Sequence, residues 1–235
     1  MFFHDYPLFL ETSETASSAV RLGWRHKFII EDNADLLAGK RVLDLASHDG
    51  RWSFAALKAG ASHVTGVEFR PDLVANAVNT FQHYDMDPST YRFISGDLFE
   101  LLRDPRAQQV EVDVVLCLGF LYHTLRYTEL LNGWRRLRPE HILLDTSVIL
   151  GDRPRLQLSL EQTKKQSAAA DTGEEHSYDG IMLTGRPTAV AVKYMLDGYG
   201  FDVVREAPWQ TYGLGDRVPE YTTGRRVSWV VKPRT

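Results

Sequence analysis

The stretch Arg41-Val42-Leu43-Asp44-Leu45-Ala46-Ser47-His48-Asp49-Gly50-Arg51-Trp52 decides the fold. A short apolar strand ends there in an acid and a turn of small residues, and the chain then enters a helix. Such a turn lets backbone N–H groups and a helix N-terminus approach a ligand closely. About eighteen residues beyond the turn, strand 63–67 is followed by Glu68, where a carboxylate can bind the two hydroxyls of a ribose. The pattern therefore predicts a site for a nucleoside-containing cofactor.

Strands and helices alternate from residue 41 to residue 146. The apolar run 112–118 is nearly continuous, as a strand buried on both faces requires. This alternation predicts a doubly wound α/β fold with a parallel sheet. The expected strands cover 41–45, 63–67, 91–95, 112–118, 141–146, 201–205 and 226–231, and the expected helices cover 51–59, 97–103, 126–137 and 187–199, with one more beginning at Pro71.

We predict a single domain over residues 1–235, with two additions to this alternating pattern. Apolar residues at helical spacing between 13 and 37 indicate one or two helices, so residues 1–39 form an N-terminal helical segment. The regular pattern lapses over 147–186, which we interpret as an insertion or a lid over the substrate. Within it, alternating leucines predict one strand over 156–160, and a polar centre carries Glu174, Glu175 and His176.

Composition narrows the class of protein. The chain has 235 residues, of which 43% are hydrophobic, and a net charge of −4, which disfavours nucleic acid as a partner without excluding it. Cys117 is the single cysteine, so an internal disulfide is excluded and a reducing compartment is favoured. Residues 1–5 do not resemble the start of a signal peptide, and no apolar run approaches the roughly 18 residues of a membrane helix. We therefore expect a cytoplasmic protein without a membrane partner, and the oligomeric state stays open, a homodimer included.

Polar or small residues follow each of the first four strands. Asp44 ends the first strand and Glu68 follows the second, while Asp97 and Leu98 follow the third and Leu118 ends the fourth. The carboxyl ends of parallel strands share one edge of a sheet, where such folds bind ligands. An acid at the third position can accept a hydrogen bond from an adenine amino group, with Leu98 against the ring.

At this point the chain resembles the class I S-adenosylmethionine-dependent methyltransferases, well over residues 40–146 and also in the last helix and two strands. The resemblance implies a Rossmann-like fold with a seven-stranded, mostly parallel sheet and an antiparallel last strand. It also implies S-adenosyl-L-methionine as the cofactor. Because the segment before the first strand commonly folds over the cofactor in this fold, Arg25 is a candidate for its methionine carboxylate. The implied cofactor-binding residues are Asp44, Ala46, His48, Gly50, Glu68, Asp97, Leu98, Leu118 and Arg25.

The turn departs from the glycine-rich pattern of that family. Only Gly50 remains, and Ala46 and His48 stand where the family has small residues. Ala46 fits the turn without strain if its φ is negative, and His48 can hold a left-handed conformation, which histidine tolerates better than most residues.

A second resemblance lies in residues 117–123, which end in Leu121-Tyr122-His123, and in Tyr221 to Arg226 before the last strand. Both are similar to the subfamily that alkylates the wobble uridine of tRNA with carboxy-S-adenosylmethionine. In that subfamily the tyrosine helps to hold the extra carboxylate or the reacting end of the cofactor, which maps to Tyr122. Whether the cofactor is ordinary or carboxylated S-adenosylmethionine stays open.

We predict methyl transfer to an oxygen or nitrogen of a small-molecule acceptor. His123 is the candidate general base, and Tyr122 is the candidate for positioning the substrate. Asp145 could bind a divalent metal with His123 or Glu174, but no paired carboxylates stand there, so no metal is expected. The alternatives are a tRNA wobble-uridine alkylating enzyme, a non-catalytic cofactor-binding subunit, and a nicotinamide-dependent reductase, although the chain lacks Gly-x-Gly-x-x-Gly.

Overall fold

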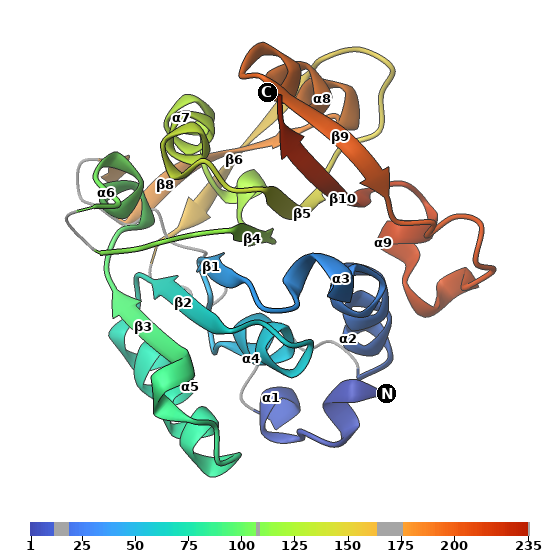
Figure 1. The fold of residues 1–235 in the computed structure, drawn as a ribbon. Coiled ribbons are helices and arrows are strands. Elements are labelled where there is room, and N and C mark those ends of the chain that lie inside the picture. The colour runs from blue at the N-terminus through green and yellow to red at the C-terminus, as the bar shows by residue number, and fades with distance from the viewer. Residues whose placement is uncertain (12–18, 107–108, 164–175, 235) are drawn as a thin grey trace.

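A seven-stranded sheet forms the centre of the computed structural model, which describes residues 1–11, 19–106, 109–163 and 176–234 (Figure 1). The strand order is β3-β2-β1-β4-β5-β10-β9. Strands β1 to β5 are parallel, and β10 lies between β5 and β9 and is antiparallel to both. This topology confirms the predicted Rossmann-like sheet with an antiparallel last strand. The strands are β1 (Arg41–Leu45), β2 (His63–Glu68), β3 (Tyr91–Ser95), β4 (Val114–Leu118), β5 (His141–Ser147), β9 (Phe201–Glu206) and β10 (Arg226–Pro233).

Successive residues of the central strands pack into two different cores, because side chains alternate between the faces of a sheet. Val42 of β1 packs in a cluster with Phe54, whereas Leu43 packs in a cluster with Trp134. The N-terminal segment and helices α4 and α5 cover the first face, and helices α6, α7 and α8 cover the second. These helices are α4 (Arg51–Lys58), α5 (Pro71–His83), α6 (Leu98–Arg103), α7 (Tyr127–Leu137) and α8 (Ala189–Gly198).

The predicted N-terminal helices are present but interrupted. Helix α2 (Ala19–Arg25) continues into a π-helical turn, η2 (His26–Ile30), then a 3₁₀ turn, η3 (Glu31–Asn33), and α3 (Ala34–Leu37). The side chain of Asn33 donates to the carbonyls of Phe28 and Ile29 at 3.1 and 3.0 Å, and so satisfies acceptors that a regular helix would bond internally. The remaining short helices are η1 (Phe2–His4), α1 (Leu8–Glu11), η4 (Pro88–Thr90), η5 (Leu121–His123), η7 (Gly215–Arg217) and α9 (Pro219–Thr222).

The segment 147–186 forms more than the single strand that the alternating leucines predict. Strands β6 (Leu156–Gln162), β8 (Ile181–Pro187) and β7 (Ser177–Tyr178) form a separate antiparallel sheet in the order β6-β8-β7, which we call the ribbon. Helix α8 begins two residues later than predicted because the Thr188 side chain caps it, accepting from Ala191 N–H at 3.1 Å. Glu174 and Glu175 lie outside the described residues.

Over the described ranges, no helix combines the length and the apolar character that a bilayer crossing requires.

Gly66 in β2 tests how closely the sheet packs under the turn that follows β1. A Cβ at this position would lie 2.6 Å from the Phe93 ring and 2.8 Å from Ser47 Oγ. We expect Gly66→Ala to lower the free energy of unfolding by about 1–3 kcal/mol, because these neighbours must move to admit a methyl group. Chemical denaturation measures this change. Gly198→Ala is the matched control: no heavy atom lies within 4 Å of its added Cβ, so helix propensity predicts a gain of up to about 1 kcal/mol. Equal losses in both variants would contradict the packing argument.

Candidate active site

A pocket lies at the carboxyl ends of β1, β2 and β4, on the edge of the sheet that the sequence predicts for the ligand. Its cavity measures about 130 Å³. Seven residues predicted for the site line it together, although they come from α2, three strand ends and η5. The lining residues are Arg21, Arg25, Ala46, Ser47, His48, Arg51, Trp52, Glu68, Arg70, Leu118, Gly119, Tyr122, His123 and Arg226.

The turn after β1 is left-handed at alternate positions. Ala46 and His48 both have φ of 53°, and Gly50 has φ of 75°. The condition of a negative φ at Ala46 is therefore not met, while the left-handed conformation of His48 is confirmed. The turn accommodates this strain because its amides are bonded: Ser47 N–H donates to Val67 O at 2.9 Å, and Gly50 N–H donates to Ser47 O at 2.9 Å. The left-handed form of an L-residue costs roughly 1–2 kcal/mol, so neighbouring contacts must hold Ala46 in place.

Glu68 joins the turn to the loop after β2. Its two carboxylate oxygens accept from the backbone N–H groups of His48 at 3.0 Å and Arg70 at 3.1 Å. Each oxygen keeps a further lone pair, so the carboxylate can also accept from the hydroxyls of a ribose. The side chain is thus held at the pocket wall in the position that the prediction assigns to it.

Four predicted cofactor residues do not line this cavity. Asp44 is buried, accepts from Ser53 Oγ at 2.7 Å, and has its pKa raised to about 7 by burial. Gly50 packs beneath the turn against Phe93. Asp97 caps α6 by accepting from Phe99 N–H at 2.8 Å, and Leu98 belongs to the hydrophobic core. The predicted contacts of Asp97 and Leu98 with adenine stay a prediction.

The buried carboxylate of Asp145 does not line the pocket but binds two arginines that do, Arg25 and Arg226. Its Oδ1 accepts from Arg25 at 2.9 Å and from Arg226 Nε at 2.7 Å, and its Oδ2 accepts from Tyr221 at 2.8 Å and from Ser228 at 2.6 Å. Burial alone would raise the pKa of Asp145, but the two guanidinium groups hold it well below its ordinary value. Two cations therefore share one buried anion.

These four contacts concern the metal site that the sequence analysis considered at Asp145. The oxygens of Asp145 are occupied by hydrogen-bond donors, and within the described residues no group of three or more histidines, cysteines and acids could hold a metal ion. Glu174, the other ligand considered, lies outside the described residues.

His123 faces a partner that the sequence analysis did not identify. Its Nδ1 lies 2.7 Å from Glu161 Oε2, and Glu161 belongs to strand β6 of the ribbon. Burial lowers the pKa of His123, but the hydrogen bond to Glu161 and the charges around it outweigh burial and raise the pKa above its ordinary value. The same contact keeps the pKa of Glu161 low against the effect of burial. The ribbon thus supplies one half of an imidazole–carboxylate pair at the pocket.

Tyr122 is surrounded by cations. Arg226 lies 3.5 Å from its hydroxyl, and the guanidinium groups of Arg226 and Arg186 each lie 5.5 Å from the centre of its ring. Burial raises the pKa of the phenol, but the charges of Arg226, His123 and Arg25 lower it overall, to about 8. The site therefore favours a negative charge at or near the Tyr122 hydroxyl.

Other site residues were also missed. Arg51 and Asp49 form a buried, two-bond ion pair at 2.8 and 2.6 Å, directly after the turn. Two opposite charges spaced two residues apart at the start of a helix are visible in the sequence and could have predicted this ion pair. In the sequence, Arg226 contributed only to the resemblance to a subfamily. The structure adds its pairing with Asp145, 81 residues away, and this pairing places Arg226 at the pocket.

The residues fit a nucleoside cofactor with an amino-acid end. Among the described residues, Arg25 Nε and Ser47 Oγ are buried without a hydrogen-bond partner, and both residues line the pocket. Buried polar atoms are normally bonded, so these two are available to a ligand. The predicted contact of Arg25 with the methionine carboxylate stays a prediction.

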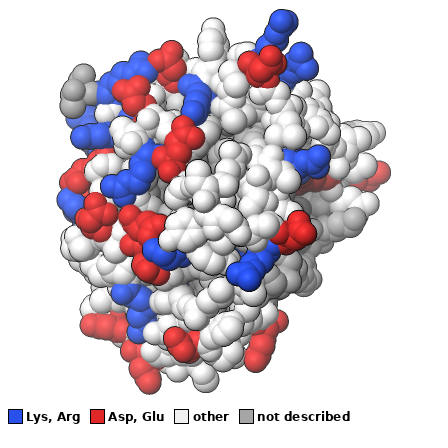
Figure 2. Space-filling model, turned by 90° about the vertical axis from the view of Figure 1, so that its right-hand side faces the viewer, with Lys and Arg blue, Asp and Glu red and all other residues white. Residues whose placement is uncertain are grey.

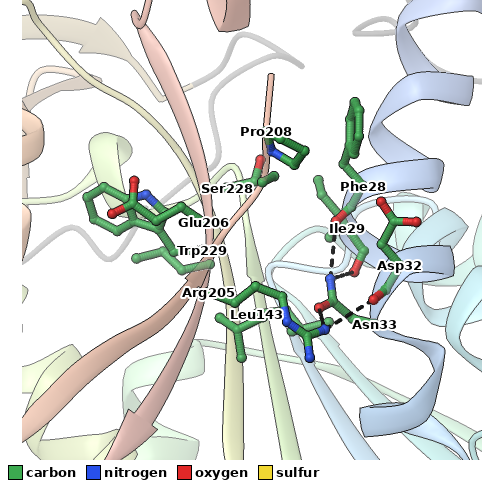
Figure 3. A pocket seen from close by; sticks show the side chains of 13 residues that line it. Phe28, Ile29, Asp32, Asn33, Leu143, Arg205, Glu206, Pro208, Ser228 and Trp229 are labelled. Atoms are coloured by element: carbon green, nitrogen blue, oxygen red, sulfur yellow. Dashed lines mark hydrogen bonds between the residues drawn. The ribbon is translucent and has the colours of Figure 1, made fainter. Parts of the chain in front are cut away.

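A second cavity, of about 220 Å³, lies between η2–η3 and strands β9–β10 (Figure 3). Arg205 crosses it and donates to Asn33 Oδ1 at 2.7 Å and to Asp32 O at 3.1 Å. None of the predicted site residues lines this cavity. It is apart from the strand ends where the ligand-binding residues converge.

Residues 42–140 match the family model of a methyltransferase domain. The ribosomal RNA large subunit methyltransferase I of Pseudoalteromonas translucida is 32% identical over 77 residues, which cover 33% of this chain and 19% of that protein. The protein of the same name from Aeromonas hydrophila is 30% identical over 103 residues, which cover 41% of this chain and 26% of that protein. The chain thus spans about a fifth to a quarter of the length of these relatives.

Solved structures share the fold. An S-adenosylmethionine-dependent methyltransferase from Clostridium acetobutylicum has a TM-score of 0.59 at 12% identity, with both chains fully covered. The N-terminal domain of EvdMO1, solved with S-adenosylhomocysteine and D-fucose, has a TM-score of 0.60 at 16% identity and covers 93% of this chain and 84% of its own.

The sheet order and the pocket at its carboxyl edge define a class I methyltransferase fold. Residues 42–140 thus match a methyltransferase domain, and the chain has the fold of the class I S-adenosylmethionine-dependent methyltransferases. The resemblance to the wobble-uridine subfamily is not confirmed by these matches.

Glu68 tests the position of the cofactor. We expect Glu68→Ala to weaken the binding of S-adenosylhomocysteine by about 1–3 kcal/mol, because hydrogen bonds to a charged group are lost. Isothermal titration calorimetry measures this loss, and thermal unfolding shows whether the turn survives. Unchanged affinity, or binding of NADH in place of S-adenosylhomocysteine, would contradict the assignment.

Asp145 tests the charge cluster. Asp145→Asn leaves Arg25 and Arg226 buried without their anion, so we expect a loss of about 3–5 kcal/mol in the free energy of unfolding. Chemical denaturation measures it. Asp202→Asn is the control, because its pair with Arg234 is exposed and exposed pairs contribute little. Similar effects of the two variants would show that the Asp145 cluster is not stabilising.

Proposed function

We propose that this protein transfers a methyl group from S-adenosylmethionine to an oxygen, or else a nitrogen, of a small-molecule acceptor. The observation that carries the proposal is the His123–Glu161 pair, which joins the strand-end pocket to the ribbon at 2.7 Å. A pocket with a ribbon residue bonded to one of its lining side chains suits a small acceptor better than a bulky one. The rRNA methyltransferases among the relatives make a nucleic acid acceptor the main rival.

The chain contributes alignment and proton transfer to this reaction. When bound, S-adenosylmethionine would supply a methyl carbon on a sulfonium, and in-line attack by the acceptor would break the carbon–sulfur bond and release S-adenosylhomocysteine. Arg25 and Glu68 would hold the two ends of the cofactor and so align it with the acceptor. Because Glu161 takes Nδ1 of His123, Nε2 is the nitrogen left to accept the acceptor's proton. Glu161 then stabilises the imidazolium that forms.

A second candidate function is supported by the cations around Tyr122. Arg25, Arg226 and Arg186 surround a region whose nearby anions are Asp145 and Glu161. A carboxylate on the donor would balance this charge, as the resemblance of Tyr122 to the wobble-uridine subfamily implies. The reaction would then transfer a carboxymethyl group.

Two labelled donors separate these candidates. Purified protein is incubated with methyl-labelled S-adenosylmethionine, or with labelled carboxy-S-adenosylmethionine, and a cell extract divided into small-molecule and RNA fractions. We expect label from S-adenosylmethionine in the small-molecule fraction. Label in the RNA fraction alone would overturn the acceptor proposal, and transfer from the carboxylated donor alone would favour the second candidate.

The base assignment has its own test, once an acceptor is found. We expect His123→Ala to lower kcat by roughly 10²–10⁴, the range for loss of a general base, with little change in cofactor affinity. The wild-type rate should rise with pH through the raised pKa of His123, because only the neutral imidazole accepts a proton. Steady-state kinetics across pH measures both effects.

Glu161→Gln is the matched control for the expected rise of the rate with pH, the rising limb of the pH profile. The variant keeps the shape of the side chain but removes the charge that raises the pKa of His123, so the rising limb should move to lower pH. A purely structural Glu161 would lower the rate and leave the limb in place. An undiminished rate in His123→Ala would remove His123 from the reaction.

A further inference from the structure

A large groove lies at the amino-terminal edge of the central sheet, away from the pocket. Its volume is about 870 Å³. It is formed where α6 and α7 end, where β1 begins and where the chain approaches β4, because helices that return across a parallel sheet end at the edge where the strands start. Its described lining residues include Arg41, Arg103, Arg106, Arg135, Arg136 and Arg138.

The groove is strongly basic in an acidic protein. Its lining residues include six arginines and two acids, Asp104 and Glu111, which give it a net charge of +4, while the whole chain carries −4. On the face that carries α2 and α9, by contrast, basic and acidic side chains are interspersed (Figure 2). The charge of the chain is therefore unevenly distributed, which its net value conceals.

Three of these arginines have no anion of their own. Arg41 pairs with Asp113 at 2.7 Å and also with Glu111, and Arg103 pairs with Glu129 at 3.2 Å. The exposed side chains of Arg106, Arg135 and Arg138, in contrast, form no hydrogen bond or ion pair within the part of the chain that the structure describes. These three charges are available to a partner.

Helix stability does not account for all of them. A cation near a helix C-terminus interacts favourably with the helix dipole; Arg103 stands in the last turn of α6, Arg135 and Arg136 stand in that of α7, and Arg138 is its C-cap residue. Arg136 also lies 3.5 Å from Leu102 O, at the end of α6. One helix end does not compensate several cations, so the arginines at positions 106, 135 and 138 repel their neighbours unless an anion lies between them.

The chemistry of the groove favours phosphate. A guanidinium group can bind a phosphate through two parallel N–H donors, and several arginines along one groove match a row of phosphates better than a single small anion. None of the described lining residues is aromatic, so the groove offers no surface on which bases could stack. It therefore fits the backbone of a nucleic acid and not its bases.

We propose that this arginine groove binds the phosphodiester backbone of a nucleic acid. The five-residue strand β1 separates the groove from the pocket, a distance of at least about 13 Å at the usual rise per residue. The groove thus anchors a polymer on the protein without presenting it to the reacting end of the pocket. The proposal is independent of the acceptor that the pocket uses.

Fluorescence anisotropy with a labelled 20-base-pair RNA duplex and the DNA duplex of the same sequence tests this proposal on the full chain. We expect binding at 50 mM salt that weakens as salt rises, with a slope of log K against log salt near −2.7 if three arginines each displace about 0.9 of a counterion. Comparison of the two duplexes shows which backbone is preferred.

The variant Arg106→Gln/Arg135→Gln/Arg138→Gln should lose at least tenfold in affinity, and its salt slope should approach zero. The control Arg153→Gln/Arg155→Gln/Arg217→Gln removes three exposed arginines elsewhere and should bind like the wild type. Thermal unfolding confirms that both variants fold, and the three single variants replace the triple variant if it does not. The proposal is overturned if neither duplex binds, if the groove variant binds as the wild type does, or if polyglutamate binds as tightly as the duplexes.

Discussion

The carboxylate of Asp145 is the interaction on which the pocket depends. It stands at the end of β5 and receives Arg25 from α2, Tyr221 from α9, and Arg226 and Ser228 from β10. Ser228 is also the residue paired with Asp145 across the two strands, so the same carboxylate that binds the arginines helps to align the antiparallel last strand. Three distant parts of the chain meet at one buried charge, and the walls of the pocket are positioned by it.

This cluster also explains what the sequence could not reveal. The turn and strand ends were predictable, because residues 41–68 lie close in sequence and the edge of a parallel sheet brings its strand ends together. The partners of Asp145 lie between 76 and 120 residues away. No periodicity connects them, so Asp145 was considered as a metal ligand when it is in fact an anion for two arginines. The left-handed Ala46 escaped prediction for a different reason, since its strain is held by contacts from β2 and not by its own preference.

The ribbon shows a second reason why part of the site could not be predicted from the sequence. Alternating leucines over 156–160 correctly indicate a strand, and such a pattern normally means that the apolar side is buried. Here Leu158 and Leu160 are 55% and 72% exposed, and the polar side of the strand faces the pocket through Glu161. The strand was therefore predictable, while its orientation, and with it the partner of His123, was not. Orientation depends on how β6 pairs with β8, and a short sequence does not determine that pairing.

Because Glu161 belongs to the ribbon, the protonation of His123 and the position of the ribbon affect each other. Any movement of the ribbon that separates Glu161 from His123 removes the charge that favours the protonated imidazole, so the proton affinity of His123 is higher with the ribbon in place. Linkage is reciprocal: uptake of a proton by His123 must then stabilise the closed ribbon by the same free energy. Loss of a proton from the imidazole would conversely weaken the contact that joins the ribbon to His123.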